Sequence, residues 1–276
     1  MPARLDGKIA VVTGATAGIG KATVEAFCDR GATVVGMARR PEPGAALEAA
    51  QGGAFVFVKG DASRTEDCER LVRTTVERYG RVDLLVNNAG YGLPLGRVES
   101  ISDDDLDAIM GVTFKSCFAM SRAALPVMQR QRSGVIVNFA SFAGVEALSH
   151  MGAYGAAKAA VIQLTKVIAV ENRDNGIRAN VLVVGSVGTE QSRDTGLEMA
   201  RIMRGPDFVP DPTRPPGVFG GSRMEADAVA RAIAMLCDDD AAEVTGAVVA
   251  IDRGFSAGWL ASTALLLRSG QLIQQT

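Results

Sequence analysis

The chain has 276 residues, of which 47% are hydrophobic and 22% are charged, and its formal net charge is −2. This length suffices for one large domain with a sizeable core, and the near balance of charge does not indicate a nucleic acid or an anionic membrane as partner. The four cysteines are far apart and only one histidine is present, which excludes a CxxC pair and a histidine metal cluster. We therefore expect a reduced, cytoplasmic protein without a metal.

The predicted elements alternate between short apolar strands and helices. No secretory signal precedes the first of them, and no uninterrupted apolar run approaches the ~20 residues that a membrane span needs. The expected strands cover residues 8–13, 32–36, 54–59, 82–86, 135–139, 178–184 and 247–251. The expected helices cover residues 21–30, 65–79, 103–131, 154–172 and 225–237.

The strands are continuous apolar runs, which is typical of a parallel sheet covered by helices on both faces. Their alternation with helices predicts an α/β fold: a single doubly wound Rossmann domain, residues 1–276, with a seven-stranded parallel sheet. Residues 186–224 are the one long stretch predicted to be irregular, and we interpret them as a substrate loop. The apolar tail, residues 259–276, is a candidate cover for a pocket or a subunit surface.

Three glycines, Gly14, Gly18 and Gly20, separate the first strand from the first helix. Glycines at such a turn let the backbone approach a pyrophosphate, which then lies against the positive N-terminus of the helix. The alternative is a tight turn that needs a positive φ. The position after an N-terminal strand and before a helix favours a dinucleotide site.

The TGxxxGxG spacing and the motifs that follow it resemble the short-chain dehydrogenase/reductase family. The matches keep the family's order over nearly the whole chain: Asp61, Asn87-Asn88-Ala89-Gly90, Ser141, Tyr154 and Lys158 in YxxxK, and Gly185-x-x-x-Thr189. The resemblance implies an oxidoreductase that uses a nicotinamide cofactor, acts on a carbonyl or a secondary alcohol, and forms a homodimer or homotetramer.

The resemblance also implies roles for individual residues. Asp61 and Ala62 would flank the adenine, Asn88 would steady the cofactor loop, and Thr189 would touch the carboxamide. The expected cofactor-binding residues are Gly14, Thr16, Gly18, Ile19, Gly20, Arg39, Asp61, Ala62, Asn88, Ala89, Gly90, Tyr154, Lys158, Gly185, Val187 and Thr189.

The end of the second strand bears on the choice of cofactor. An NAD-binding fold commonly places an acid there to bond the ribose 2′-hydroxyl, whereas this chain has Ala38 followed by Arg39. A guanidinium matches a 2′-phosphate in charge and geometry, so we favour NADP(H) over NAD(H). Solvated loop arginines are the alternative, and Ala17 argues for NAD(H), because many NADP-dependent members of the family carry a basic residue at that position.

Tyr154 and Lys158 are four residues apart and share one face of a helix. Hydride transfer to a carbonyl leaves an alkoxide that a tyrosine can protonate if a nearby ammonium lowers its pKa from ~10. The resemblance adds that Lys158 binds the nicotinamide ribose. Ser141 ends an apolar strand, where its hydroxyl is suited to bond the substrate oxygen. The alternatives are an ordinary surface Tyr–Lys pair and a helix-capping serine.

Thr113 stands where the family usually has an asparagine that opens a helix hydrogen bond and holds a water for proton relay. A threonine hydroxyl lacks the separate donor and acceptor arms of an amide. We keep Thr113 as a candidate catalytic residue, with the relay either slowed or compensated by water. Two further departures, Val184 for a proline and Arg253 for a glycine, do not touch the chemistry.

Three functions compete. A ketone or aldehyde reductase, or an alcohol dehydrogenase, is favoured by the intact set of Ser141, Tyr154 and Lys158. A non-catalytic, cofactor-binding regulatory protein has only Thr113 in its favour. An enoyl reductase or dehydratase is disfavoured, because related enoyl reductases space the tyrosine and the lysine further apart.

The substrate is the least defined part of the prediction. The segment 186–224 is rich in apolar side chains, which suits a small hydrophobic ligand, and packing of the loop on its own domain is the alternative. These side chains are Leu197, Met199, Ile202, Met203, Phe208, Val209 and Phe219. His150 is either a substrate contact or a loop residue without a role.

Overall fold

The computed structural model describes residues 4–209 and 223–257. Its centre is a sheet of seven strands in the order β3-β2-β1-β4-β5-β6-β7, in which every neighbouring pair is parallel. The strands are β1 (Ile9–Thr13), β2 (Thr33–Ala38), β3 (Phe55–Lys59), β4 (Leu84–Asn87), β5 (Gly134–Ser141), β6 (Ile177–Val184) and β7 (Val248–Ile251). The predicted doubly wound Rossmann fold is confirmed. Phe219 and the tail 259–276 lie outside the described residues.

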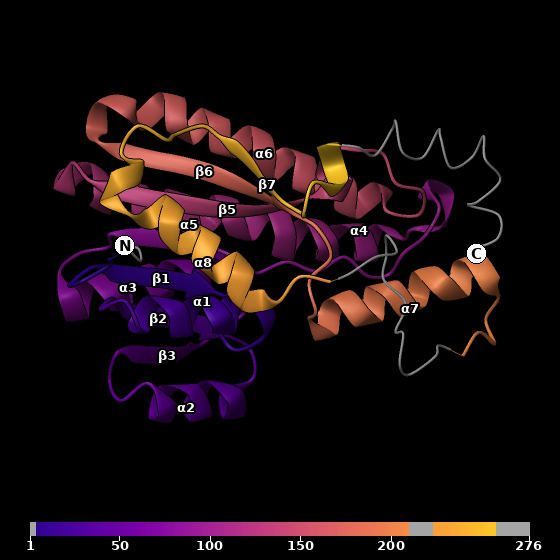
Figure 1. The fold of residues 1–276 in the computed structure, drawn as a ribbon, viewed down its shortest axis with the longest axis horizontal. Helices are drawn as coiled ribbons and strands as arrows, with labels where there is room; N and C mark the ends of the chain where they lie inside the picture. Colours follow the sequence, from indigo (N-terminus) through magenta and orange to yellow (C-terminus); the bar gives the residue numbers. More distant parts are fainter. Residues whose placement is uncertain (1–3, 210–222, 258–276) are drawn as a thin grey trace.

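Helices cover both faces of the sheet (Figure 1). The α-helices are α1 (Gly18–Cys28), α2 (Pro41–Ala50), α3 (Thr65–Tyr79), α4 (Asp103–Met110), α5 (Ser116–Gln131), α6 (Gly152–Asn172), α7 (Glu190–Arg204) and α8 (Ala226–Cys237). One hydrophobic core joins α1, α2 and α8 to one face of the sheet, and a second joins α3, α5 and α6 to the other face. The α7 helix lies apart from these layers, beyond one end of the strands (Figure 1).

Two helices, α2 and α7, lie where the sequence predicts none. The α2 segment begins with Pro41, and proline is compatible with the first turn of a helix because the N–H that it lacks has no partner there. The prediction that residues 186–224 are irregular is wrong for Glu190–Arg204, which form α7. The predicted helix 103–131 is interrupted, because Gly111–Lys115 between α4 and α5 form a π-helical segment.

The strand order changes direction between β1 and β4, which pair through Val11 and Leu85. In an open α/β sheet, such a switch point leaves a crevice outside the carboxyl ends of the strands. The segments that follow β1, β4, β5 and β6 all begin at this edge of the sheet. The fold therefore gathers there the glycine turn, Asn88, Ser141 and Gly185.

The segment 152–175 is long and apolar enough to cross a membrane by length and composition alone. This segment contains α6, whose residues Ile168 and Ala169 belong to the core between α5 and the sheet. A core helix passes the same test, so the finding is weak support for a membrane span.

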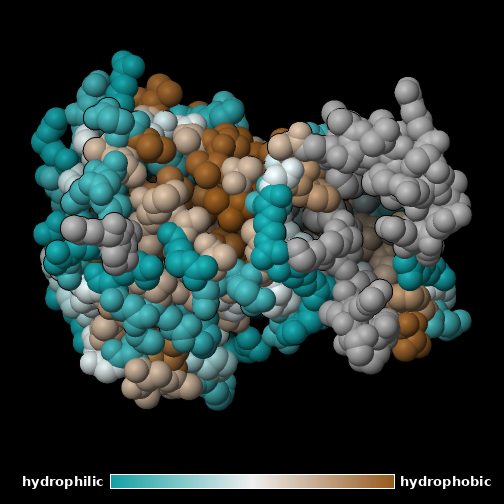
Figure 2. Space-filling view, viewed as in Figure 1, coloured by the Kyte–Doolittle hydropathy of each residue, from teal (hydrophilic) through white to brown (hydrophobic). Residues whose placement is uncertain are grey.

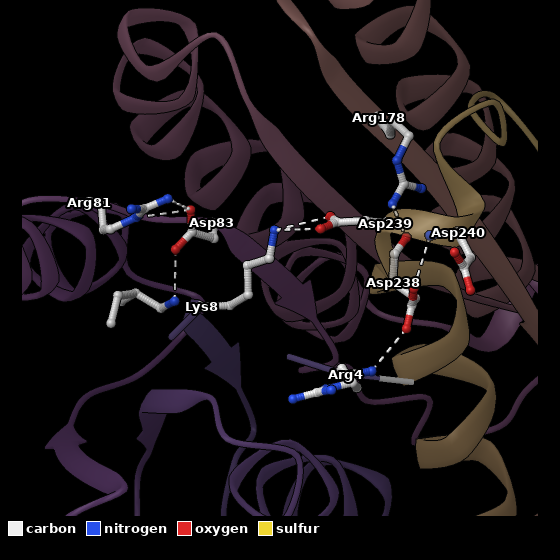
Figure 3. A network of polar contacts seen from close by, with 9 residues as sticks. Arg4, Lys8, Arg81, Asp83, Arg178, Asp238, Asp239 and Asp240 are labelled. Atoms are coloured by element: carbon white, nitrogen blue, oxygen red, sulfur yellow. Dashed lines mark hydrogen bonds and ion pairs between the residues drawn. The ribbon is translucent and has the colours of Figure 1, made fainter. Parts of the chain in front are cut away.

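A polar network lies at the opposite edge of the sheet, near the amino ends of β1 and β4 (Figure 3). The carboxylate of Asp83 accepts hydrogen bonds from the backbone N–H of Ile9, at 2.8 Å, and from the Arg81 guanidinium, at 2.6 Å. Lys8 forms an ion pair with Asp239 at 3.0 Å. The network thus joins the starts of two central strands to the segment after α8.

Replacing Asp83 with alanine is expected to lower the free energy of unfolding by about 1–3 kcal/mol, because the buried N–H of Ile9 loses its acceptor. The matched control is Asp239→Ala, which removes a carboxylate whose side chain is 84% exposed. The loss of such a surface ion pair costs about 0–1 kcal/mol. Urea denaturation of both variants measures the difference, and equal effects would contradict this account.

The edge strand β7 is less covered than the other strands. Figure 2 shows hydrophobic residues gathered on the face where β7 and α8 lie. Met235 of α8 and Val248 of β7 are 59% and 42% exposed. This exposed apolar surface is a candidate for the predicted self-association of the chain.

Candidate active site

A cleft of about 840 Å³ opens at the carboxyl ends of the strands. It brings together most of the predicted site residues from seven separate segments of the chain. The predicted residues that line it are Gly14, Thr16, Gly18, Ile19, Arg39, Asp61, Ala62, Asn88, Ala89, Gly90, Ser141, Tyr154, Lys158, Gly185, Val187 and Thr189. Gly20, Thr113 and His150 do not line it, and neither do the described apolar side chains that were predicted to suit a substrate: Leu197, Met199, Ile202, Met203, Phe208 and Val209.

The glycine turn is held against the end of β4. The side-chain amide of Asn88 donates to the carbonyls of Thr13, at 3.0 Å, and Gly14, at 3.3 Å. A Cβ on Gly20 would lie 2.0 Å from the Gly14 carbonyl oxygen, so Gly20 allows α1 to pack on the turn instead of lining the cleft. Gly18 has φ +50°, and a Cβ on it would lie 2.9 Å from Thr189 on the opposite wall.

The N-terminus of α1 faces the cleft and favours an anion. No acidic residue lies in its first turn, and Gly18 and Ile19 line the cleft. Because the first backbone N–H groups of a helix have no partners within it, they are free to bind phosphate oxygens.

Two arginines lie at the end of β2. Arg39 and Arg40 both line the cleft, and both are exposed. Within the described part of the chain, neither forms an ion pair. Ala38, at the last position of β2, also lines the cleft. This end of the cleft is therefore positive and has no acid on β2.

Ser141 ends β5, and its hydroxyl serves two neighbours. The oxygen accepts a hydrogen bond from the backbone N–H of Ala143, at 3.3 Å, and so caps the short 3₁₀ helix Phe142–Gly144. The same hydroxyl is within hydrogen-bonding reach of Tyr154. The capping role and the role beside the tyrosine are thus compatible.

Tyr154 and Lys158 project from one face of α6 into the cleft. Lys158 is buried, and its ammonium donates to the carbonyl of Phe139 at 2.7 Å. The Nζ atom lies 5.6 Å from the centroid of the Tyr154 ring. The spacing of four residues therefore produces the predicted juxtaposition.

The pKa values of Tyr154 and Lys158 are both shifted from their usual values. Burial raises the pKa of Tyr154 above its usual value, and a hydrogen bond with Ser141 opposes the shift. Burial lowers the pKa of Lys158 to about 8, while the neighbouring Cys117 opposes that shift. Desolvation outweighs the hydrogen bond with Ser141 in this arrangement, and the lowering of the tyrosine pKa by Lys158 beside a bound nicotinamide stays a prediction. Tyr154 is consequently protonated at neutral pH, the form that a general acid requires.

Thr113 lies behind the cleft, in the π-helical segment between α4 and α5. Its hydroxyl accepts from the backbone N–H of Tyr91, at 3.3 Å, and donates to the carbonyl of the same residue, at 3.2 Å. A single hydroxyl therefore accepts one bond from the backbone of Tyr91 and donates another to it, although it lacks the separate arms of an amide. The next glycine, Gly92, packs on the Tyr154 ring. The Thr113 hydroxyl thus holds the backbone of the loop beside Tyr154, and its part in a proton relay stays a prediction.

His150 does not contact the cleft. Its ring nitrogen Nδ1 lies 2.9 Å from the hydroxyl of Ser149, and its φ is +67°. Two groups of lining residues that were not predicted from the sequence lie in the loop after β4 and in the first turns of α7. They are Tyr91, Gly92, Leu93, Glu190, Gln191, Ser192, Asp194 and Thr195. Thr189 caps α7 by accepting from the N–H of Ser192, and this capping position was the available signal.

No group of histidine, cysteine, aspartate or glutamate side chains among the described residues is suited to hold a metal. The buried thiols have raised pKa values, about 11 for Cys68 and about 12 for Cys117, with burial as the main cause. These thiols are therefore protonated at neutral pH.

The arrangement of a glycine turn, a strand-ending serine and a Tyr-x-x-x-Lys helix around one cleft matches a known family. The model of the short-chain dehydrogenases matches residues 8–199. The chain belongs to this family. It is therefore an oxidoreductase that acts on alcohol or carbonyl substrates with NAD(H) or NADP(H).

Several short-chain dehydrogenases are similar over most of their length. An oxidoreductase of Thermotoga maritima, described as uncharacterized, is 37% identical over 91% of this chain and 98% of its own. A 3beta-hydroxysteroid dehydrogenase of Mediterraneibacter gnavus is 35% identical over 92% of this chain and 96% of its own. The crystal structure of levodione reductase has a TM-score of 0.83 and 28% identity, covering 93% of this chain and 100% of that one.

Proposed function

We propose that this short-chain dehydrogenase reduces a carbonyl compound to a secondary alcohol with NADPH, and catalyses the reverse oxidation with NADP⁺. The observation that carries the proposal is the cleft itself. Ser141, Tyr154 and Lys158 lie at one end of it, and Arg39 and Arg40 at the other, both free of ion pairs among the described residues.

The residues present fit a nicotinamide dinucleotide. The N-terminus of α1 would hold the pyrophosphate, Asp61 and Ala62 the adenine end, and Lys158 the nicotinamide ribose. Ser186 lines the cleft beside Gly185, and its buried hydroxyl has no hydrogen-bond partner within the described residues. An orphaned buried hydroxyl at this end suits a polar group such as the carboxamide.

The preference for NADP(H) rests on charge. A 2′-phosphate carries negative charge that Arg39 and Arg40 would bind through charge-assisted hydrogen bonds. Ala38 stands at the end of β2, so no acid is present there. Such an acid would repel the 2′-phosphate and bond the free 2′-hydroxyl of the NAD(H) ribose.

The protein supplies the proton and the electrostatic stabilisation. When bound, the nicotinamide supplies the hydride. Ser141 donates a hydrogen bond to the substrate oxygen, which stabilises the charge that develops there. Because its pKa is raised, Tyr154 is protonated at neutral pH, and it delivers its proton to the same oxygen. Lys158 favours the phenolate that this transfer leaves.

The affinity for NADPH is expected to fall as the pH rises through about 8. The pKa of Lys158 is about 8, so its ammonium is present below that pH and lost above it. The dissociation constant should increase by at most about tenfold per pH unit above that value. Fluorescence titration of wild type and of Lys158→Met with NADPH at several pH values measures the dissociation constant. A constant affinity in wild type, or the same pH dependence in the variant, would contradict it.

The substrate is proposed to be a small hydrophobic carbonyl compound or alcohol. Of the apolar residues of the segment 186–224, Met199 packs against the cluster that contains Tyr154, whereas Met203 and Val209 are exposed. The cytoplasmic location and the homodimer or homotetramer stay predictions. The exposed apolar surface at Met235 and Val248 supports self-association.

Steady-state oxidation of NADPH and of NADH against a panel of ketones and aldehydes tests the proposal. We expect turnover with at least one ketone and a higher kcat/KM with NADPH than with NADH. No turnover with any carbonyl, or a preference for NADH, would overturn the function or the cofactor assignment respectively.

A further inference from the structure

One hydrogen bond joins α7 to the loop after β4. The carboxylate oxygen Oε1 of Glu198 accepts it from the backbone N–H of Leu95, at 2.9 Å, across 103 residues of sequence. Leu95 is buried and Glu198 is half-buried. A carboxylate that accepts from an N–H forms a charge-assisted bond, roughly twice as strong as a neutral one.

The next backbone amide of this loop, that of Gly96, is bound by the segment that precedes α6. The N–H of Gly96 donates to the carbonyl of His150 at 3.0 Å, and Gly96 forms an isolated parallel bridge with Met151. The α6 helix begins at Gly152, immediately after this bridge, and carries Tyr154. Two consecutive amides therefore link α7 on one side to the tyrosine-bearing helix on the other.

Met199, the residue after Glu198, packs in an apolar cluster at this junction. The cluster consists of Leu93, Leu95, Ala143, Leu148, Met151, Tyr154 and Met199. Of these, Leu93, Met151 and Tyr154 also line the cleft. Met199 itself does not line the cleft, so α7 supports this apolar wall from behind, and the bond of Glu198 fixes the helix in that place.

The rest of α7 contributes little to its attachment within the described residues. Its buried residues there are Thr195, Gly196 and Ala200, which offer small apolar areas. Ile202 and Met203 are 37% and 67% exposed. With so little apolar surface buried among the described residues, the position of α7 should depend strongly on one good hydrogen bond.

We propose that Glu198 is a positioning residue that holds α7 against Leu95, and that Met199 determines specificity by supporting, from behind, the apolar wall of the cleft beside Tyr154. The inference rests on the carbonyl reduction proposed above and deepens it. The substrate class that this wall fits is a ketone with an apolar group on the side of the carbonyl that faces Leu93 and Met151.

Glu198→Ala tests the positioning role, and Glu198→Gln is its matched control, because the amide oxygen of glutamine accepts the same bond from Leu95. In Glu198→Ala we expect KM for an apolar ketone to rise about tenfold, with kcat and the dissociation constant of NADPH changed less than about threefold. Glu198→Gln keeps this bond in its weaker neutral form, so all three quantities should stay within about threefold of wild type. A loss of kcat equal to the rise in KM, or equal effects in both variants, would overturn the positioning role.

Met199→Ala tests the specificity role. Across ketones with apolar groups of increasing size, the variant should shift the highest kcat/KM toward the larger group, by about tenfold relative to the smaller one. Glu198→Ala should instead raise KM for the whole series. An unchanged order of substrates in Met199→Ala would contradict the role of that side chain.

Hydrogen exchange provides a readout that does not need a substrate. The Leu95 amide should exchange about tenfold faster in Glu198→Ala than in wild type or Glu198→Gln, while the amides of β5 stay protected in all three. Unchanged exchange at Leu95 would overturn the inference even if the wild type is active. An inactive wild type with faster exchange at Leu95 would count against the proposed function alone.

Discussion

Tyr154→Phe is expected to lower kcat for carbonyl reduction by about 10²- to 10⁴-fold, the usual contribution of a general acid. Phenylalanine keeps the ring that packs against Gly92 and lies 5.6 Å from the Lys158 ammonium, and it removes only the hydroxyl. The affinity for NADPH should therefore change by less than about threefold. Stopped-flow or steady-state kinetics, with a separate fluorescence titration of the cofactor, measure the two effects.

The matched control is Tyr91→Phe, the same substitution at another tyrosine of the same cleft. The Tyr91 side chain is 44% exposed, and the bonds to Thr113 come from its backbone, so they survive the change. We expect kcat within about threefold of wild type. A Tyr154→Phe variant as active as Tyr91→Phe would remove Tyr154 from the mechanism.

Ala38→Asp is expected to reverse the preference for the cofactor. The new carboxylate would stand at the end of β2, where it repels a 2′-phosphate and can bond a free ribose hydroxyl. We expect the dissociation constant of NADPH to rise about 100-fold while that of NADH stays the same or falls. Titration of each variant with both cofactors measures the ratio.

Arg39→Ala tests the attraction between the 2′-phosphate of NADPH and the guanidinium of Arg39 separately from the absence of an acid on β2. Loss of a charge-assisted bond to the phosphate should weaken NADPH by about 10- to 100-fold and leave NADH within about threefold. Arg73→Ala is the charge-matched control, because Arg73 is an exposed residue of α3 that pairs with Glu77 and does not line the cleft. Equal losses for both cofactors in Arg39→Ala would contradict phosphate binding by this residue.

The sheet was predictable because each of its strands is marked by a short, continuous apolar run in the sequence. Strands such as 135–139 are continuous apolar runs, and each is followed by a turn or a helix, which suffices to define a parallel sheet. The site was predictable for a related reason: the residues with chemical roles follow strands, and the carboxyl ends of parallel strands meet at one edge. Ser141 and Asn88 come together in this way without any information on side-chain contacts.

The features that could not be predicted from the sequence depend on contacts between residues that are distant in the chain. The α7 helix carries Gly196 and exposes Met203, so its pattern is not that of a buried helix, and its attachment through Glu198 to Leu95 spans 103 residues. The role of Thr113 could not be derived from residue type, because the π-helical segment brings one hydroxyl to both polar groups of Tyr91. The spacing of Tyr154 and Lys158 predicts their proximity but not their burial, and burial determines the direction of both pKa shifts.

The most direct test of the central claim is the fate of the hydride. NADPH that carries deuterium in place of both hydrogens at C4 of its nicotinamide should transfer one deuterium to the carbinol carbon of the product alcohol for each NADPH oxidised, as measured by mass spectrometry. The same transfer should be at least about 10²-fold slower in Tyr154→Phe. Oxidation of NADPH without deuterium in the alcohol, or transfer at an unchanged rate in the variant, would contradict the account.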